Sequence, residues 1–259
     1  MRVLSIANQK GGTGKSATAQ NVGYILAESG LRILLVDNDP QSSLSRSTGI
    51  HDASGRSMAQ VYGGSKAGKL SIKSGARDLG KGKPWIMSSD IELSFSEMQI
   101  DSRIGRERIL SKALESVRDD FDLVIIDCPP SLGWLTLNAL NASDAVLVPT
   151  QPQVVDLRGV ALFLDTLETL REELNPDLEL MGILVTFYDT RITHHIEALK
   201  EIKAAGLPLL PVQIGRSIRV GEAAGAGLPV TEFAPNNPQA ENYQKLAQEV
   251  KSWLKRKQD

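Results

Sequence analysis

Short apolar runs alternate along this chain with longer segments of helical periodicity. The runs are hydrophobic throughout instead of alternating with polar residues, which is typical of strands that are buried on both faces. The pattern predicts strands at 2–7, 31–37, 84–89, 122–127, 145–150, 180–187 and 207–214, and helices at 15–29, 105–119, 134–141, 156–174, 193–204, 218–226 and 238–255. Alternation of this kind favours an α/β fold, doubly wound, in which helices cover both faces of a mostly parallel sheet.

One stretch breaks the alternation. Residues 49–83 are rich in Gly, Ser and Lys and have weak periodicity, so we expect a mobile surface excursion there instead of a domain boundary. We expect a single domain over residues 1–259. Because the first predicted strand starts at residue 2, we expect no helix-turn-helix domain before it.

The composition excludes several kinds of site and several classes of protein. The net charge of −2 and the pI of about 6.0 mean that nucleic-acid binding would need a local basic patch. The single cysteine, Cys128, excludes an intramolecular disulfide, and with three histidines it makes no zinc-ligand spacing. No apolar run reaches about 18 residues and no export signal is visible, so we expect a cytoplasmic protein.

The segment that follows the first apolar run carries the clearest chemistry. It reads QKGGTGKS and matches the phosphate-binding loop G-x-x-x-x-G-K-[ST], with Lys15 and Ser16 at the positions that contact phosphate and Mg²⁺. The loop departs from that motif at Gln9, where its first glycine would stand, and at Lys10, a second lysine inside the turn. A predicted helix follows the loop, and its N-terminus adds partial positive charge. We expect a nucleotide-binding segment made of Gly11, Gly12, Thr13, Gly14, Lys15, Ser16 and Ala17.

Acidic residues stand at the ends of two other apolar runs. Asp37 and Asp39 follow one run and Asp127 closes another. Ligands of open α/β sheets bind outside the carboxyl ends of the strands, and an Asp there is the usual second Mg²⁺ contact in phosphate-loop enzymes. Phe187 stands where a guanine-reading motif would have lysine, which favours ATP over GTP. The sequence therefore predicts a site for ATP and Mg²⁺.

At these residues the chain resembles the ParA/Soj family of deviant Walker A partition ATPases. NQKGGTGKS is similar to the family's K-G-G-x-G-K-[ST], VDNDPQSSLS to its D-x-D-P-Q, and DLVIIDCPPSLGWLTLNAL to its Walker B and switch region. Later blocks, MSSDIELSFSE, VTFYDTR and IRVGEAAGAGLPV, align in the family's order. The resemblance covers nearly the full length and implies an ATPase whose hydrolysis is slow and stimulated by a partner.

The resemblance also implies roles for single residues. Lys10 would reach across a nucleotide-sandwich homodimer to the phosphates of the other subunit, as an arginine finger does in trans. Lys15 would contact the phosphates of its own subunit, Ser16 and Asp127 would hold Mg²⁺, and Asp39 would orient the attacking water. Asn38 departs from the family, which usually has an apolar residue between the two aspartates.

Different members of this superfamily do different work. Iron–sulfur relatives need at least two cysteines per chain, which one cysteine excludes. MinD-like relatives bind membranes through a C-terminal amphipathic helix, and here Leu246, Val250, Trp253 and Leu254 share one helical face. We expect that face to pack on the body, so no membrane is expected, and a MinD-like membrane-surface ATPase stays as the alternative. A metabolic ligase or kinase is disfavoured, because Lys10 implies a dimer and the sequence shows no identifiable pocket for a small acceptor substrate.

The favoured function is the partition or positioning of a DNA molecule or other cargo. The ATP-bound homodimer would bind double-stranded DNA nonspecifically on the nucleoid, and a ParB-like or cargo-adaptor protein would stimulate hydrolysis and release. Nonspecific binding needs only cations that face phosphates. The residues expected to supply them are Arg191, Arg216, Arg219, Lys251 and Lys255, with Arg256 and Lys257 beside them.

Overall fold

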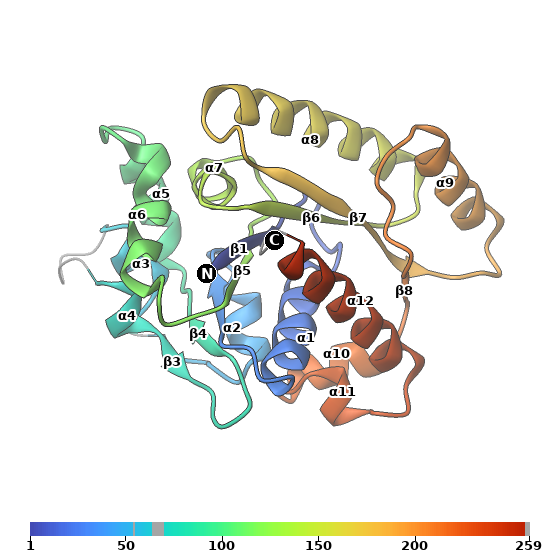
Figure 1. Ribbon diagram of the computed structural model, residues 1–259, viewed down its shortest axis with the longest axis horizontal. Helices are drawn as coiled ribbons and strands as arrows, with labels where there is room; N and C mark the ends of the chain where they lie inside the picture. Colours follow the sequence, from blue (N-terminus) through green and yellow to red (C-terminus); the bar gives the residue numbers. More distant parts are fainter. Residues whose placement is uncertain (54, 64–69, 257–259) are drawn as a thin grey trace.

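The computed structural model describes residues 1–53, 55–63 and 70–256. They form one eight-stranded sheet in the order β3-β4-β2-β5-β1-β6-β7-β8, and every pairing is parallel except that of β3 with β4 (Figure 1). The strands are β1 (Arg2–Ile6), β2 (Ile33–Asp37), β3 (Arg77–Asp78), β4 (Trp85–Met87), β5 (Leu123–Asp127), β6 (Ala145–Thr150), β7 (Glu179–Tyr188) and β8 (Ile214–Gly215). The predicted doubly wound, mostly parallel sheet is confirmed.

Helices cover both faces of this sheet (Figure 1). One layer contains α3 (Met58–Val61), α4 (Ile72–Gly75), α5 (Glu92–Ile100), α6 (Ile109–Leu114), α7 (Trp134–Asn141), α8 (Val154–Glu173) and α9 (Thr193–Ala204), with the 3₁₀ turns Arg106–Arg108 and Glu115–Val117 on either side of α6. The other layer contains α1 (Lys15–Glu28), α2 (Ser43–Ser47), α10 (Ile218–Gly225), α11 (Val230–Phe233) and α12 (Pro238–Lys255).

Each strand supplies both hydrophobic cores. Successive side chains of a strand point to opposite faces of the sheet. In β5, Val124 and Ile126 therefore join the core under α7 and α8, whereas Leu123 and Ile125 join the core under α1 and α12. All five residues of β5 are buried, which is why its sequence is apolar without alternation.

The connections diverge from the centre of the sheet. From β1 the chain passes through α1 to β2 on one side, whereas from β5 it passes through α7, in the other helix layer, to β6 on the other side. Such a divergence leaves a crevice at the carboxyl ends of the central strands, where open α/β sheets bind ligands. Asp127 is paired in register with Asp37 of β2 and with Ile6 of β1, so the acidic ends and the phosphate loop meet there.

Two predicted elements differ from the structure. The strand expected at 207–214 is reduced to β8 and a single bridge between Leu209 and Ile183, because Pro208 and Pro211 have no N–H to donate to a ladder. The helix expected at 105–119 has only the central α6 in α-helical form, with a 3₁₀ turn at each end.

The expectation of a surface excursion at 49–83 is wrong for much of the segment that the structure describes. Its α3, α4 and β3 belong to the fold, and Met58, Tyr62 and Ile72 are fully buried in the core. Ser57 and Gln60 close a capping box at the start of α3. Residue 54 and residues 64–69 lie outside the described residues.

Candidate nucleotide-binding site

The phosphate loop joins the end of β1 to the start of α1. Gly12 (φ 72°) and Gly14 (φ 82°) both have left-handed backbone conformations that glycine adopts without strain. Gly14 is also the N-cap of α1, which begins at Lys15. The unpaired N–H groups and the positive end of this helix therefore face the loop, as an anion site requires. Of the predicted segment, Gly11 and Gly12 are exposed, and Gly14, Ser16 and Ala17 are half-buried.

The carboxyl ends of β6 and β7 hold the loop in place. Asn8 donates its side-chain amide to the Pro149 carbonyl at 2.6 Å, and Gln151 donates to the Gly12 carbonyl at 2.9 Å. From β7, the Thr186 hydroxyl donates to the Thr13 carbonyl at 2.9 Å. The loop is therefore preorganised before any ligand binds. Asn8 and Thr186 lie in sequence blocks that resemble the family, but no role for them or for Gln151 followed from the sequence.

Lys15 lies inside its own loop. Its ammonium donates to the Asn8 carbonyl at 3.2 Å and to the Lys10 carbonyl at 3.0 Å, and only 6% of the residue is exposed. Burial lowers the pKa of Lys15, and the nearby Asp127 carboxylate opposes that shift. A cation held by carbonyls at a helix N-terminus is placed to receive phosphate oxygens.

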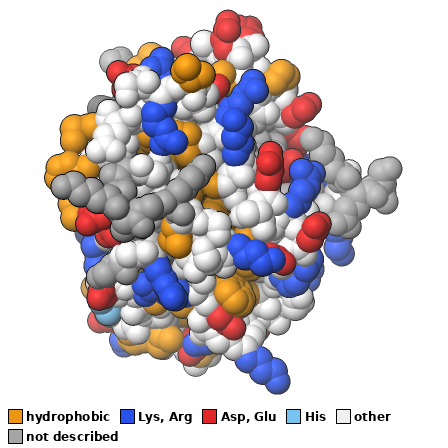
Figure 2. All heavy atoms as spheres, turned by 90° about the vertical axis from the view of Figure 1, so that its left-hand side faces the viewer, with side chains coloured by type: hydrophobic (Ala, Val, Ile, Leu, Met, Phe, Trp, Pro, Cys, Tyr) orange, Lys and Arg blue, Asp and Glu red, His pale blue; other side chains and the backbone are white. Residues whose placement is uncertain are grey.

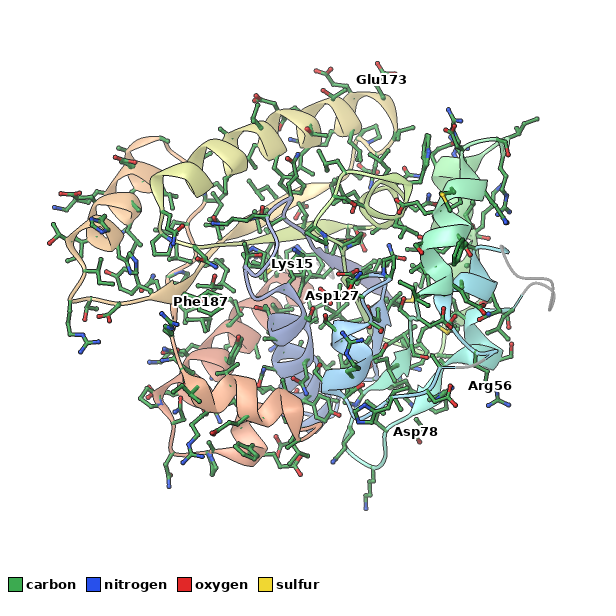
Figure 3. The ribbon with its side chains drawn as sticks, turned by 180° about the vertical axis from the view of Figure 1, so that it is seen from behind. Lys15, Arg56, Asp78, Asp127, Glu173 and Phe187 are labelled. Atoms are coloured by element: carbon green, nitrogen blue, oxygen red, sulfur yellow. The ribbon has the colours of Figure 1, made fainter. Side chains whose placement is uncertain are left out.

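Asp127 is the least satisfied charged group of the site. It is fully buried, and neither carboxylate oxygen has a hydrogen-bond partner within the described part of the chain. Burial raises the pKa of Asp127 well above its usual range and the neighbouring Asp37 raises it further, whereas the nearby Ser16 hydroxyl and Lys15 oppose the shift. Figure 3 shows Lys15 and Asp127 together near the middle of this side.

A divalent cation fits these residues. An unpartnered buried carboxylate beside a hydroxyl is a hard oxygen donor set, and Mg²⁺ is usually held by one or two such groups together with substrate phosphates and water. Among the described residues no cluster of three or more His, Cys, Asp or Glu side chains could hold a metal by itself. The donors therefore suit a cation that arrives with a nucleotide.

The two aspartates after β2 differ in their surroundings. Asp37 accepts hydrogen bonds from the Ser45 N–H and hydroxyl, both at 2.7 Å, and so fixes the start of α2. Burial raises the pKa of Asp37 to about 6, although these hydrogen bonds oppose the shift. Asp39 accepts from the Gln41 N–H at 2.9 Å and is 8% exposed, so it lies nearer the opening of the site.

Asn38 has a structural role that explains its polarity. Its backbone N–H donates to the Asp127 carbonyl at 3.0 Å, and its fully buried amide donates to the Leu135 carbonyl of α7 at 2.8 Å. The buried Tyr62 hydroxyl lies near the same amide. Asn38 thus connects the segment that carries Asp39 to the first turn of the helix after Asp127.

Lys10 lies on the outer rim of the loop. Its backbone N–H donates to the Asn8 side chain at 2.9 Å, and its ammonium is 3.4 Å from the Gln153 side-chain oxygen. Lys10 and Lys15 therefore leave the same turn in different directions, because Lys15 turns back into the loop. This is the arrangement expected if only one of the two lysines serves the chain's own phosphates.

A cavity beside the loop has an aromatic wall. It measures about 510 Å³, and its lining includes Gly12, Gln151, Phe187 and Arg216. Phe187 is 38% exposed and has a left-handed backbone (φ 54°), which is strained for a residue with a bulky side chain. Figure 3 shows it on the β7 side of Lys15. In the sequence, Phe187 indicated only that guanine is disfavoured, although its place at the end of a predicted strand also pointed to the site.

The predicted DNA-contact residues fall into two groups. Arg191 and Arg216 line one polar groove of about 650 Å³ together with Lys245. Arg191 also donates to both oxygens of Asp189, and these bonds lower the pKa of that carboxyl. Arg219 follows in α10 and pairs with Glu222 at 2.9 Å.

The remaining predicted cations lie towards the other end of α12. The Lys251 ammonium donates to the Ser29 hydroxyl at 3.2 Å. Lys251 lies about 18 Å along α12 from Gln239, whose side-chain oxygen accepts the Gly215 N–H beside the groove. Lys255 lies about one turn further. Lys257 lies outside the described residues.

The apolar stripe of the C-terminal helix is part of the core. Leu246, Val250, Trp253 and Leu254 are 0%, 0%, 3% and 8% exposed and pack in the core on the α1 side of the sheet. The guanidinium of Arg2 lies 3.7 Å from the Trp253 ring centre. In the part of the chain that the structure describes, no helix is long and apolar enough to cross a membrane.

Comparisons with known proteins agree with this geometry. A family model described as an AAA domain matches residues 1–180. The chain is 36% identical over 252 residues to the sporulation initiation inhibitor protein Soj of Bacillus subtilis, covering 96% of this chain and 98% of that protein. It is 37% identical over 255 residues to the chromosome partitioning protein ParA of Caulobacter vibrioides, with coverage of 96% and 94%.

A solved structure is similar over the same length. The crystal structure of cobyrinic acid a,c-diamide synthase from Mycobacterium smegmatis with bound ATP analogue and magnesium has a TM-score of 0.86 and 36% identity, covering 99% of this chain and 96% of that one. Similarity to Soj and ParA over nearly the whole of both chains means that this protein belongs to the ParA/Soj family of chromosome-partitioning ATPases.

Proposed function

We propose that this protein is a Mg²⁺-ATP-dependent ATPase that closes into a nucleotide-sandwich homodimer, binds DNA nonspecifically and positions a DNA molecule or other cargo. The observation that carries the proposal is the second lysine of the phosphate loop. Lys15 turns into its own loop, where it would meet the chain's own phosphates, whereas Lys10 lies on the outer rim. A cation on that rim suits phosphates that are held by a second copy.

The site residues divide the work of phosphoryl transfer, which is mainly positioning and charge stabilisation. The loop N–H groups and Lys15 would bind the phosphates, and Ser16 and Asp127 would hold Mg²⁺, which neutralises phosphate charge when it is bound. Asp39, near the opening, would orient the attacking water. Phe187 offers a flat apolar surface on which an adenine ring could stack.

The rim of the loop favours close approach of a second copy. Gly11 and Gly12 are exposed, and among the described residues, apart from Gly12 and its two chain neighbours, no atom lies within 4 Å of the place where a side chain of Gly12 would begin. The two loops and two nucleotides could therefore come together without obstruction. ATP can drive such a switch only if the dimer binds ATP better than the monomer does.

DNA binding is supported by the groove that holds Arg191 and Arg216, with Arg219 beside it. These cations would face the phosphate backbone without reading bases. A dimer would present two such grooves, so binding would strengthen when ATP closes the dimer. A ParB-like or adaptor protein would then stimulate hydrolysis and release.

The decisive experiment compares the mass of the protein in solution with Mg²⁺-ATP and with Mg²⁺-ADP, by light scattering after gel filtration. Wild type should be dimeric with ATP and monomeric with ADP. Lys10→Ala should stay monomeric with ATP while it still binds the nucleotide. Lys112→Ala removes an equal charge from an exposed position on α6 and should dimerise normally. Normal dimerisation of Lys10→Ala would contradict the trans role.

Two other functions are less well supported. A membrane-surface ATPase of MinD type would need an exposed amphipathic C-terminal helix, but the apolar stripe of α12 is buried. The structurally similar synthase raises the possibility of a ligase, which would hydrolyse ATP only with an acceptor present. ATP hydrolysis without any acceptor, accelerated by DNA or by a partner protein, would argue against it.

A further inference from the structure

A second cavity lies at the opposite end of the elements that carry the nucleotide site. It measures about 630 Å³ and is bounded by the end of α1, the start of β2, the β3–β4 hairpin and the segment around Phe121. We call it the hairpin cavity. Figure 3 shows Asp78, one of its lining residues, well away from Lys15 and Asp127. Since α1 and β2 run between the two sites, they are separate.

The floor of the hairpin cavity is apolar and aromatic. Leu31, Ile33 and Val117 line it beside Trp85 and Phe121. The Trp85 and Phe121 rings meet edge to face, with centroids 6.1 Å apart, and Trp85 is 39% exposed although it lies on a strand. An exposed tryptophan braced by a second ring in a concave site offers a flat surface for an apolar ligand.

The rim carries charges of both signs. Four cations line the cavity, namely Arg32, Lys73, Lys81 and Lys83, against the two carboxylates of Asp78 and Asp120. Arg32 pairs with Asp122 at 2.6 Å, Lys73 pairs with Asp120 at 2.9 Å, and Lys83 is 3.6 Å from Glu232, so three of the four cations are neutralised. Within the described residues no carboxylate pairs with Lys81, which stands in the Gly80–Gly82 turn that forms one wall. Lys81 therefore remains as the rim cation that is available to an anion.

We propose that the hairpin cavity binds a small amphipathic anion, with its aromatic or aliphatic body on Trp85 and its acidic group towards Lys81 and Lys83. The volume lies within the usual range for small-molecule sites. An apolar floor alone would accept any apolar molecule, but Lys81 at the rim favours a negative charge at one end of the ligand. The proposal does not depend on the function proposed above.

The site can be tested with the aromatic sulfonate 8-anilinonaphthalene-1-sulfonate, whose fluorescence rises in apolar surroundings. The nucleotide site should first be filled with Mg²⁺-ADP, so that the sulfonate does not occupy the phosphate loop. Wild type should bind one equivalent saturably. N-phenyl-1-naphthylamine has the same aromatic body without the sulfonate and should bind about tenfold more weakly, because it cannot pair with Lys81 at the rim.

Variants locate the bound probe. Trp85→Ala should weaken binding of the sulfonate about tenfold or more, because it removes the aromatic floor. Lys81→Ala with Lys83→Ala should reduce the preference for the sulfonate over the neutral amine, whereas Lys112→Ala should not. Circular dichroism and the melting temperature should verify that each variant is folded.

A competing site for the probe lies on α5 and the turns that flank it. Ile91, Phe95, Met98 and Ile104 are 62%, 58%, 69% and 106% exposed. Figure 2 views the side of the molecule that carries α3 to α6, and hydrophobic side chains gather on it. Phe95→Ser should leave binding unchanged. Loss of binding in Phe95→Ser but not in Trp85→Ala, equal affinity for the neutral amine, or no saturable binding would each overturn the proposal.

Discussion

Asp127 shows how a single residue can be kept for a ligand at the expense of stability. Its carboxylate is fully buried without a hydrogen-bond partner among the described residues, although an unsatisfied buried polar group costs about 1–3 kcal/mol and a charged one more. Such a group is tolerated where function needs it. In the function proposed above, Mg²⁺ that arrives with the nucleotide would supply the missing partner.

Asp127→Asn should therefore have opposite effects on stability and activity. The free energy of unfolding of the nucleotide-free protein should rise by roughly 1–2 kcal/mol at neutral pH, because the amide removes the cost of burying this carboxyl, whether as a charge or with a bound proton. Mg²⁺-dependent ATP hydrolysis should be lost, because the amide is a poor Mg²⁺ ligand. Denaturant unfolding and an ATPase assay measure the two effects.

The stability gain should depend on pH. Since burial raises the folded pKa of Asp127, the folded chain keeps a proton that the unfolded chain has already lost above about pH 4. The stability of wild type therefore falls as the pH rises through that interval, and the advantage of Asp127→Asn should vanish below about pH 4. Asp144→Asn is the matched control. That carboxylate accepts the Val3 N–H at 2.7 Å, so its loss should destabilise the protein.

Sequence could predict which residues gather at the site but not how each is satisfied. The positions of Lys15, Asp37 and Asp127 follow from strand ends that must meet at one edge of a parallel sheet. The difference between Asp37, bound by Ser45, and Asp127, bound by no side chain or N–H of the described residues, depends on how a loop folds back. Likewise, no local pattern shows that the amide of Asn38 reaches Leu135.

At the scale of elements, α12 forms part of the hydrophobic core. Seven of its residues are buried, and it packs along α1, the helix that starts with Lys15. Leu246→Ala should lower the free energy of unfolding by about 2–5 kcal/mol, because it leaves a cavity in this contact. Denaturant unfolding measures the loss, and Gln244→Ala, at an exposed position on the same helix, should change it little.

The same packing predicts how the protein behaves towards lipid. Since the apolar stripe of α12 is buried, wild type should not sediment with anionic liposomes in the presence of ATP. Sedimentation that needs ATP and is lost on removal of residues 246–259 would contradict this and favour the membrane-surface alternative.

Long elements were predictable from sequence, whereas short ones were not. The runs that form β5 and β6 are apolar up to their last residue because both faces are covered, and α12 keeps a helical period over several turns. In contrast, α3 and α4 have four residues each, too few to show a period, and tertiary contacts stabilise them. For that reason the segment 49–83 resembled an excursion.

The whole molecule carries a small net negative charge, −2, so any binding to DNA must come from an uneven distribution of charge. Affinity for random-sequence duplex DNA should be measurable only with ATP, and its logarithm should fall linearly with the logarithm of salt concentration. Arg219→Glu should abolish this binding and leave ATP-dependent dimerisation intact. Fluorescence anisotropy at several salt concentrations measures the first effect.

A matched control for the DNA experiment is Lys112→Ala, which should bind as wild type does. Retained affinity in Arg219→Glu would show that the contact surface lies elsewhere, for example at the Lys251 end of α12. Absence of binding with ATP, with ADP and without nucleotide would contradict DNA binding as a whole.

The two outermost strands of the sheet, β3 and β8, are each two residues long. A long free edge strand is a template on which another chain can add its own backbone, and brevity is one way in which proteins avoid such pairing. These two short edge strands therefore offer little backbone on which another chain could add a strand. The homodimer proposed above would therefore be held by side chains and loops, and the binding or loss of a ligand can make and break contacts of that kind.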